Sequence, residues 1–148
     1  MPIHRATIGD LDALTALFDA YRVFYKQPSD MEGARAFLAE RLERSESIIF
    51  IAVDEDGQAL GFTQLYPSFT STGMKRVYIL NDLFVAEGGR RQGIGTALLE
   101  AAADFAREAG AARLALSTAF DNLAAQSVYE AHGWSRDQNF YSYNLKLG

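Results

Sequence analysis

The chain has 148 residues, of which 49% are hydrophobic and 22% charged, a composition typical of a globular domain with a buried core. A formal net charge of -5 argues against a general nucleic-acid binder, because phosphate binding relies on dense basic patches. The absence of cysteine excludes disulfides, a thiol nucleophile and a cysteine zinc site, and the two histidines give no basis for a metal centre. We expect one domain over residues 1–148.

The sequence shows no targeting or membrane-spanning pattern. Its opening residues have neither the basic region nor the apolar core of a signal peptide, and no apolar run approaches the roughly 18 residues that a spanning helix needs. We therefore expect a cytoplasmic protein without a membrane or nucleic-acid partner. The acidic balance permits a cationic substrate without identifying one.

A strand and two helices are expected first. Residues 3–7 are predicted to form the strand, and a helix opens near Asp10, since apolar residues recur after it at three- and four-residue steps. Ser29 has the position of a helix N-cap, and Glu32 follows it at capping-box spacing. A second helix is therefore predicted from this point to about Glu43.

Three strands are expected next. The run at 48–53 is continuously apolar and rich in β-branched residues, as in a strand covered on both faces. Asp56-Gly57 predicts a tight turn into a partner strand from 58 to about 68. A turn then leads into a long central strand at 75–85. The sheet is predicted to be antiparallel up to this strand.

The segment RRQGIG at 90–95 joins the central strand to an alanine-rich helix that ends near Gly110. A strand at 113–117 follows a strand-helix-strand crossover, so it should run parallel to the central strand. Residues 122–132 are predicted to form a short helix. Alternating apolar residues then predict a final strand; they are Tyr141, Tyr143, Leu145 and Leu147.

The start of the alanine-rich helix is a candidate anion site. A helix N-terminus has unpartnered N–H groups and partial positive charge, and Gly93 and Gly95 leave its backbone bare. Arg90 and Arg91 add charge, and Thr96 adds a hydroxyl. The alternative is that the glycines ease packing and the arginines are merely solvated.

Two other phosphate-binding patterns fit poorly. A Walker loop ends in Gly-Lys-Ser/Thr, whereas Thr96-Ala97 follow the last glycine here, so that loop is excluded. A dinucleotide fingerprint calls for glycine or alanine where Leu98 stands, and for an acidic residue at the end of the next strand, which 113–117 lacks. A nucleotide or dinucleotide enzyme is therefore the weaker alternative.

The segments LNDLFV, RRQGIGTALL, LALST and DNLAAQSVYEAHGW together resemble the GCN5-related N-acetyltransferase (GNAT) superfamily across essentially the whole chain. The family signature Arg/Gln-x-x-Gly-x-Gly/Ala matches at 90–95, and the segment LNDLFV is similar to a branch with diamine and fungal histone or D-amino-acid acetyltransferases. The resemblance implies an α/β (α+β) GNAT fold. Its mixed, mostly antiparallel sheet would have six to seven strands, about four flanking helices and a V-shaped splay between central strands.

The resemblance also implies where acetyl-CoA binds. Its pantetheine arm would lie beside the backbone of Leu83, Phe84 and Val85, where a bulge splays the central strand. An N–H near Val85 would then polarise the thioester carbonyl. The remaining implied cofactor-binding residues are Arg90, Arg91, Gln92, Gly93, Ile94, Gly95, Thr96, Asn122, Ala125 and Tyr129.

The implied catalytic residues are Tyr129 and Asp82. A phenol, with a reference pKa of about 10, can protonate the departing thiolate, and this role matches the position of Tyr129. Asp82 would accept the proton of the amine or hold a cationic substrate, although a purely structural carboxylate is equally consistent with its place on the strand. Tyr25 and Tyr66 would line the acceptor side, although Tyr25 also fits the apolar face of its helix.

The resemblance implies a homodimer that acts on a small-molecule amine or a protein lysine. It leaves open whether the acceptor is a polyamine, an amino acid, an antibiotic or a lysine side chain. A catalytically silent acyl-CoA sensor is the alternative, and the presence of Tyr129 disfavours it.

Overall fold

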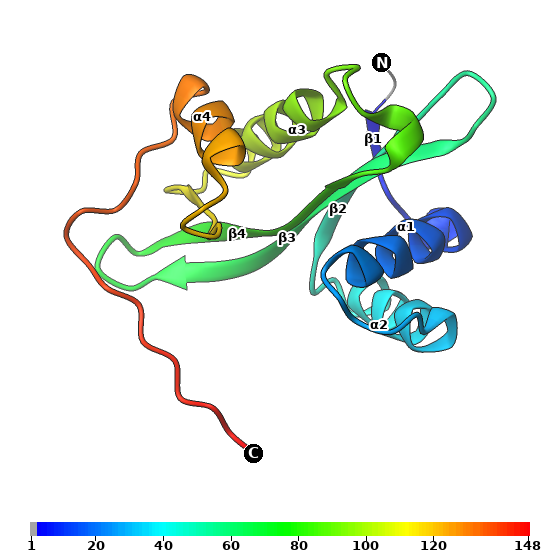
Figure 1. The fold of residues 1–148 in the computed structure, drawn as a ribbon. Helices are drawn as coiled ribbons and strands as arrows, with labels where there is room; N and C mark the ends of the chain where they lie inside the picture. The colour runs from blue at the N-terminus through cyan, green and yellow to red at the C-terminus, as the bar shows by residue number, and fades with distance from the viewer. Residues whose placement is uncertain (1–2) are drawn as a thin grey trace. The chain divides into compact units, whose positions relative to one another are not determined.

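The computed structural model describes residues 3–148 and divides the chain into two compact units, one ending at Ser117 and the other spanning Thr118–Gly148. The first unit contains a five-stranded mixed sheet in the order β1-β2-β3-β4-β5 (Figure 1). The α/β architecture is as expected, with fewer strands than the six to seven predicted. The strands are β1 (Ile3–Arg5), β2 (Ile48–Val53), β3 (Ala59–Thr70), β4 (Lys75–Val85) and β5 (Leu114–Ala115).

Four α-helices accompany the sheet in the described residues. The first three belong to the first unit, and the last belongs to the second. Strands β1 to β4 pair antiparallel, whereas β5 pairs parallel to β4 after a crossover through α3, as predicted. The helices are α1 (Leu11–Phe24), α2 (Met31–Glu43), α3 (Ile94–Glu108) and α4 (Leu123–Ala131).

The sheet of the first unit is covered on both faces, with α1 and α2 on one side and α3 on the other (Figure 1). The α1 face is closed by buried leucines at three-residue steps, Leu14 and Leu17, together with Leu38 of α2 and Phe62 of β3. Burying a side chain of this size contributes about 1.5–3 kcal/mol. The packed faces hold β3 and β4 rigidly in the middle of the unit.

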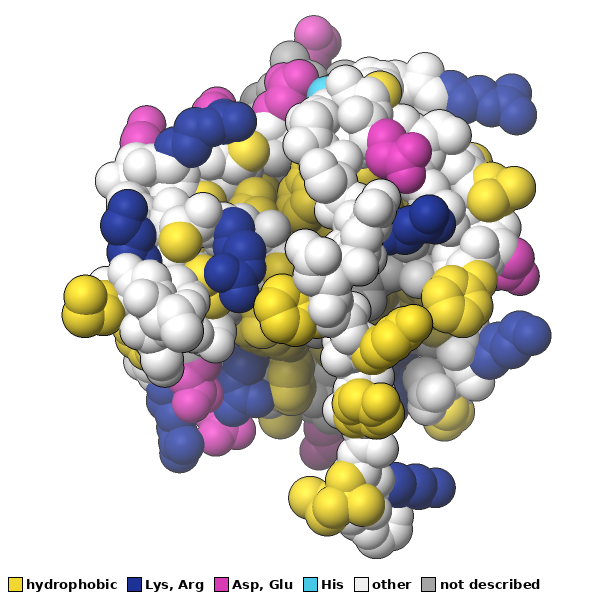
Figure 2. All heavy atoms as spheres, turned by 90° about the vertical axis from the view of Figure 1, so that its left-hand side faces the viewer, with side chains coloured by type: hydrophobic (Ala, Val, Ile, Leu, Met, Phe, Trp, Pro, Cys, Tyr) yellow, Lys and Arg dark blue, Asp and Glu magenta, His cyan; other side chains and the backbone are white. Residues whose placement is uncertain are grey.

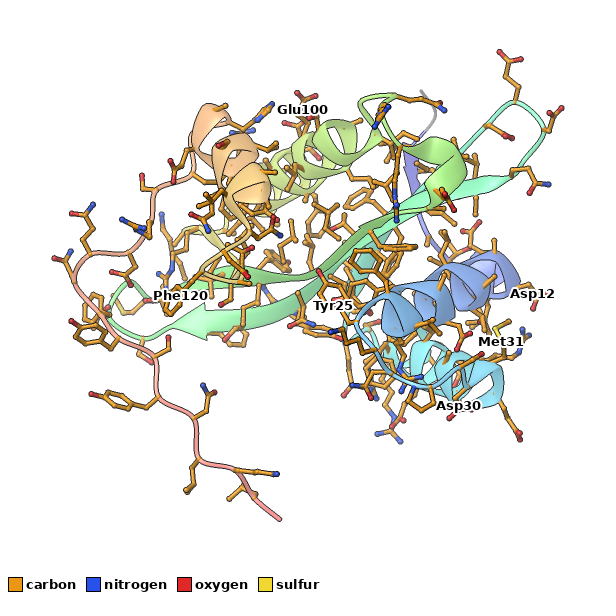
Figure 3. The ribbon with its side chains drawn as sticks, viewed as in Figure 1. Asp12, Tyr25, Asp30, Met31, Glu100 and Phe120 are labelled. Carbon is orange, nitrogen blue, oxygen red and sulfur yellow. The ribbon has the colours of Figure 1, made fainter. Side chains whose placement is uncertain are left out.

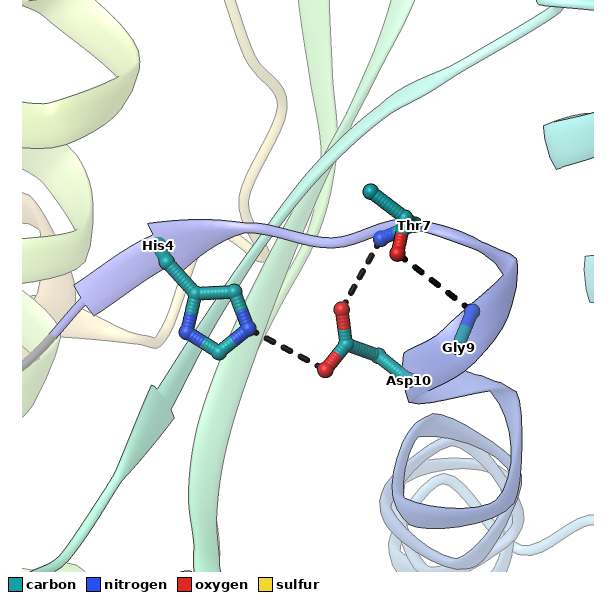
Figure 4. Close-up of polar contacts among 4 residues, drawn as sticks. All are labelled: His4, Thr7, Gly9 and Asp10. Carbon is teal, nitrogen blue, oxygen red and sulfur yellow. Dashed lines mark hydrogen bonds and ion pairs between the residues drawn. The ribbon is translucent and has the colours of Figure 1, made fainter.

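A polar network ties the start of α1 to β1 (Figure 4). Thr7 Oγ1 accepts the N–H of Gly9 at 3.3 Å, and Asp10 Oδ2 accepts the N–H of Thr7 at 2.9 Å. His4 Nε2 lies 3.1 Å from Asp10 Oδ1. Partial burial alone would raise the pKa of Asp10, but these bonds from Thr7 and His4 outweigh it and lower that pKa.

The cap of α2 is one residue later than predicted. Asp30, not Ser29, is the N-cap, and its Oδ1 accepts the N–H of Gly33 at 2.9 Å. The hydroxyl of Ser29 instead donates to Asp19 Oδ2 at 2.7 Å. A carboxylate is the stronger acceptor for the helix N–H groups, so Asp30 takes the cap and Ser29 braces the connection between α1 and α2.

The prediction of a final strand is wrong for the chain as described. Residues 141–148 form no strand, and the strand predicted at 113–117 is reduced to β5 (Leu114–Ala115). Alternating hydrophobicity predicts which side chains a strand would bury, but a strand also needs a neighbouring edge to satisfy its N–H and C=O groups. Residues 141–148 have no such neighbour among the described residues.

Candidate active site

A β-bulge in β4 lies at the centre of the candidate site. Gln64 of β3 is in register with Asp82, but the next residue, Leu65, is in register with Leu80. Asn81 is therefore an extra residue without a register partner. The bulge occurs in the segment for which the sequence predicted it.

The edge of β4 that follows the bulge is open. Strand β5 pairs with β4 only at Tyr78 and Ile79, so within residues 3–148 the later part of β4 has no strand on this side. The N–H of Ala86 donates to β3 at Leu60 O (2.8 Å), and N–H groups of a strand alternate between its two edges. The N–H of Val85 therefore points to the open edge.

The same alternation separates the three predicted residues of β4. Leu83 and Val85 present their backbone to the open edge, whereas the backbone of Phe84 faces its partner Phe62 on β3. Phe84 contributes its ring to the site instead. This open edge beside a short parallel neighbour is the splay that the predicted fold requires.

The N-terminus of α3 lies next along the chain and has no side-chain cap. Its N-cap is Gly93, in the left-handed conformation with φ of 76°, and the first turn contains no acidic residue. In contrast, Asp30 caps α2 and Asn122 caps α4. The first N–H groups of α3 are thus available to an anion.

The loop before α3 is held by its own side chains. Arg90 Nε donates to Val85 O at 3.2 Å, and Gln92 Nε2 donates to Gly88 O at 3.0 Å. Arg91 has φ of 66°, a left-handed conformation that is uncommon outside glycine, and its side chain is exposed. The loop therefore brings two arginines and bare backbone to the start of α3.

Gly95 has no steric reason within the fold to be glycine. A Cβ placed there would meet only Val85 Cγ2 at 3.8 Å, which is ordinary contact, and the backbone does not need a positive φ. By contrast, a Cβ at Gly61 would lie 2.8 Å from Phe84 O. The bare surface at Gly95 and the uncapped N–H groups fit a diphosphate that approaches the backbone closely. Ile94 contributes only backbone, because its side chain is buried in the core.

Asp82 directly follows the bulge residue and is 4% exposed. Its Oδ2 accepts Gln64 Nε2 at 2.7 Å, and its Oδ1 accepts Asn81 Nδ2 at 3.2 Å. The hydroxyl of Tyr21 on α1 also bonds to this carboxylate. The charge is thus held by donors from three elements of the chain.

Gln64 is a site residue that the sequence prediction missed. It is fully buried, and its Oε1 has no hydrogen-bond partner among the described residues. Because a carboxylate only accepts hydrogen bonds, the amide nitrogen must face Asp82, which leaves Oε1 directed away from it. Leaving such an oxygen unsatisfied costs free energy, so the site favours a ligand or water that donates to it.

Aromatic rings surround this polar cluster. The ring of Tyr21 contacts those of Tyr25 at 5.1 Å and Phe84 at 5.9 Å, and Phe24 lies 6.1 Å from Phe84. Figure 3 shows Tyr25 at the end of α1 beside the central strands, where its side chain is 57% exposed. These ring faces next to a buried carboxylate form a surface that suits an ammonium group.

The pKa values of two tyrosines near Asp82, Tyr21 and Tyr66, are raised. Burial, and secondly the charge of Asp82, raise the pKa of Tyr21 far above its ordinary value. The same two causes raise the pKa of Tyr66 to about 12, against an opposing effect of Arg41. Both hydroxyls therefore remain protonated donors at neutral pH.

The second unit contains the remaining predicted residues. Asn122 Oδ1 caps α4 by accepting the N–H of Ala125 at 3.3 Å. Tyr129 is half-buried, with its ring 6.0 Å from that of Trp134, and the backbone N–H of Trp134 donates to the backbone carbonyl of Tyr129 at 3.0 Å. The capping role predicted for Asn122 is confirmed, and the Gly133 turn brings the tryptophan back onto the helix.

Residues 3–148 lack the features of two other kinds of site. No helix within them is both long and apolar enough to span a bilayer. No three histidine or acidic side chains within them gather in a way that could hold a metal ion.

The comparisons with known proteins agree with this geometry. The Acetyltransferase (GNAT) family model matches residues 14–134. The chain is 50% identical to the uncharacterized N-acetyltransferase YhfO of Bacillus subtilis, and the match covers 99% of this chain and 98% of that protein. It is 36% identical to an aminoglycoside N(6')-acetyltransferase of Klebsiella aerogenes over 67% of this chain and 66% of the other. The crystal structure of a probable acetyltransferase superposes with a TM-score of 0.96, at 49% identity and 100% and 99% coverage.

Proposed function

We propose that this chain, which belongs to the acetyltransferase (GNAT) family and is an acetyltransferase, transfers the acetyl group of acetyl-CoA to a primary amine. The amine would attack the thioester directly in a ternary complex. The observation that carries the proposal is the uncapped N-terminus of α3 beside the open edge of β4. Both features are costly or unnecessary for the fold alone, and both suit a cofactor with a diphosphate and an extended amide chain.

Residues of the first unit would hold the cofactor, which supplies the acetyl thioester when bound. Backbone N–H groups at the start of α3 would accept the diphosphate, with Arg90, Arg91 and Thr96 adding charge and a hydroxyl. The open backbone of Leu83 and Val85 would bond the amides of the pantetheine arm. The N–H of Val85 would be the donor to the carbonyl oxygen, where negative charge grows during attack.

Asp82 would act on the acceptor amine. An ammonium with a pKa near 10.4 is only about one part in a few thousand neutral at pH 7, so the amine must lose a proton before it attacks. The buried carboxylate would take that proton directly or through water, and its charge would hold the ammonium beforehand. Tyr25 and Tyr66 would contact the remainder of the acceptor.

Tyr129 would supply the second proton. Its phenolic oxygen would protonate the sulfur that leaves when the amine attacks, a role that rests on its match to the family pattern. Asn122 and Ala125 would help to position the cofactor from the same helix. The chain is proposed to be active rather than a silent acyl-CoA sensor, because a sensor has no use for this phenol.

Small cationic amines are the proposed acceptors. Besides the aminoglycoside acetyltransferase, the D-amino-acid N-acetyltransferase HPA3 of Saccharomyces cerevisiae is 29% identical over 91% of this chain. The aromatic faces of Tyr21 and Tyr25 near Asp82 support a positively charged group. A cytoplasmic location and a homodimer remain predictions.

The proposal is tested by measuring thiol release from acetyl-CoA with polyamines, amino acids, aminoglycosides and lysine peptides. Thiol release that depends on at least one primary amine, with the acetylated product seen by mass spectrometry, is the expected result. A chain that binds coenzyme A in calorimetry but acetylates no amine would support the sensor instead. A chain that binds no coenzyme A would remove the proposal.

Gly95→Asp separates the stability of α3 from its use as an anion site. A carboxylate in the first helical turn should leave the free energy of unfolding unchanged or raise it by about 0.3–1 kcal/mol. It should weaken coenzyme A binding at least about tenfold, because like charges about 4 Å apart near a protein surface repel by about 1–4 kcal/mol. Calorimetry against the uncharged control Gly95→Asn measures the effect, and equal affinities would place the diphosphate elsewhere.

A further inference from the structure

Gln64 is an unfavourable residue for the middle of a sheet. It lies on β3 between Thr63 and Leu65, with Ile49 of β2 as its register partner, and all four residues are fully buried. Glutamine is mostly exposed in folded proteins, because burying a polar amide costs free energy unless its hydrogen bonds are remade. An apolar side chain of similar volume would fill the same space without that cost. The packing of the sheet therefore gives no reason for an amide at this position.

The two polar atoms of the Gln64 amide have different surroundings. Its Nε2 donates to Asp82 Oδ2 at 2.7 Å, whereas its Oε1 has no hydrogen-bond partner among the described residues. A buried oxygen without a partner lowers the stability of the fold, and only the bond from the nitrogen opposes that effect. Within residues 3–148, Asp82 is thus the only hydrogen-bond partner of this amide.

Asp82 needs such donors in order to carry a charge. Figure 2 shows charged side chains standing out from one face of the molecule, which is their ordinary place, whereas Asp82 is 4% exposed. Burial favours the protonated form of a carboxyl group, and hydrogen bonds donated to the carboxylate favour the ionised form. A protonated Asp82 cannot accept a proton from an ammonium. The donors therefore decide whether this residue can act as the base.

The donors also leave Asp82 a single direction in which to act. An ionised carboxylate has about four acceptor positions, and three of them are filled by Gln64 Nε2, Asn81 Nδ2 and the hydroxyl of Tyr21. One position remains for the proton of an amine. The three donors thus fix the side of the carboxylate from which an acceptor can be deprotonated.

The bond from Gln64 is the one that solvent cannot replace. Asn81 is exposed and its Nδ2 lies 3.2 Å from the carboxylate, so water can take its place. The Gln64 nitrogen is closer and fully buried among packed side chains. In a variant with a side chain of the same volume, no water can substitute for it.

The other titratable groups around Asp82 do not change charge near neutral pH. Tyr21 of α1 and Tyr66 of β3 face the carboxylate, and both have raised pKa values that keep them protonated. Arg41 of α2 acts on Tyr66 and is permanently charged. A change in the pH profile that follows a substitution at Gln64 can therefore be assigned to Asp82.

We propose that Gln64 is a positioning residue for acetyl transfer, whose amide keeps Asp82 ionised and directs the free acceptor position of the carboxylate toward the amine. The inference rests on the proposed function, in which the ammonium loses one proton and Asp82 gains it. Gln64 acts through Asp82, and the stability lost at its Oε1 accompanies this role.

Gln64→Met tests this role, because methionine keeps the length and volume of the side chain and removes the donor. With a primary amine that the native chain acetylates, kcat/KM for that amine should fall about tenfold or more at pH 7. The loss should become smaller from about pH 6 to about pH 9.5, because a buried carboxyl group with fewer donors ionises at higher pH. The affinity for coenzyme A in calorimetry should be unchanged, since the open edge of β4 is not altered.

Thr63→Val is the matched control. Thr63 is also fully buried, and its Oγ1 donates to the backbone carbonyl of Asp82 at 2.8 Å. Valine has nearly the shape of threonine, so this variant removes a buried hydrogen bond to Asp82 and leaves the carboxylate alone. It should unfold at a lower temperature and keep the native pH profile. A Gln64→Met variant with the native profile, or with the same loss at every pH, would overturn the proposal.

Carbon-13 NMR of the Asp82 carboxyl group separates this inference from the proposed function. The carboxyl chemical shift is followed against pH in the native chain and in Gln64→Met, without any substrate. Its midpoint should lie at least about one pH unit higher in the variant. Equal midpoints would refute the role of Gln64 even in a chain that acetylates amines. A native chain that acetylates no amine would instead remove the proposed function, and a raised midpoint would then leave Gln64 as a structural partner of Asp82 alone.

Discussion

A Tyr129→Phe variant is expected to lose turnover by about 10² or more while binding coenzyme A with nearly unchanged affinity. The ring of Tyr129 on α4 packs against Trp134, which follows the end of that helix, and phenylalanine preserves this contact. The substitution therefore removes the phenolic proton and leaves the shape intact. Without a donor at the departing sulfur, thiolate must leave unprotonated or wait for water, and kcat falls.

Steady-state kinetics with a saturating amine measures this loss, and calorimetry measures the affinity for coenzyme A. Tyr141→Phe is the matched control, because Tyr141 is exposed and has no proposed part in the chemistry. If Tyr129→Phe turns over as fast as the native chain, the phenol is not the proton donor. If it loses affinity as much as turnover, Tyr129 serves binding rather than catalysis.

Asp82→Asn is expected to lower kcat/KM by about 10² at pH 7 and to recover part of this loss as the pH rises toward the pKa of the amine. An amide cannot take a proton from the ammonium, so the variant depends on the small fraction of acceptor that is already neutral. That fraction increases tenfold with each pH unit below the amine pKa. Measuring kcat/KM of the variant and of the native chain from about pH 6 to about pH 9.5 shows whether the loss becomes smaller as the pH rises.

Two controls separate proton transfer from structure. Asn81→Ala removes a donor to Asp82 and keeps the carboxylate, so its pH profile should follow that of the native chain. Thermal unfolding shows whether the asparagine in Asp82→Asn still satisfies Gln64 and Tyr21. A loss of activity that is the same at every pH, in a stably folded variant, would assign Asp82 to binding and exclude it as the base.

The order of the elements follows closely from sequence patterns. Strand β4 (Lys75–Val85) has its predicted bounds, and α3 and α4 begin beside Gly93 and Asn122 as the motifs indicate. These elements have strong local signals: apolar runs, glycine at a left-handed position and a capping amide. The prediction of a final strand was wrong because the residues of a strand do not determine which sheet edge it can pair with.

The neighbours of Asp82 could not be predicted because of the bulge. Simple alternation would put Tyr78, Leu80, Asp82 and Phe84 on one face of β4. In the structure Tyr78 packs on Phe105 of α3, whereas Phe84 packs on Tyr21 of α1. The extra residue at 81 reverses the alternation, and only the pairing with β3 reveals where it does so. Gln64 was missed for this reason.

The bulge at Asn81 also separates the local shape of β4 from the orientation of Asp82. Because the extra residue shifts the phase of the pleat, exchanging the Asn81 side chain keeps Asp82 turned toward Gln64. Deleting position 81 would restore a regular ladder in which Leu80 and Asp82 keep their present partners, Leu65 and Gln64, and the carboxylate stays on the α1 face. Such a deletion would therefore remove the local bend of β4 without turning Asp82, whereas substitutions at position 81 would keep the bend.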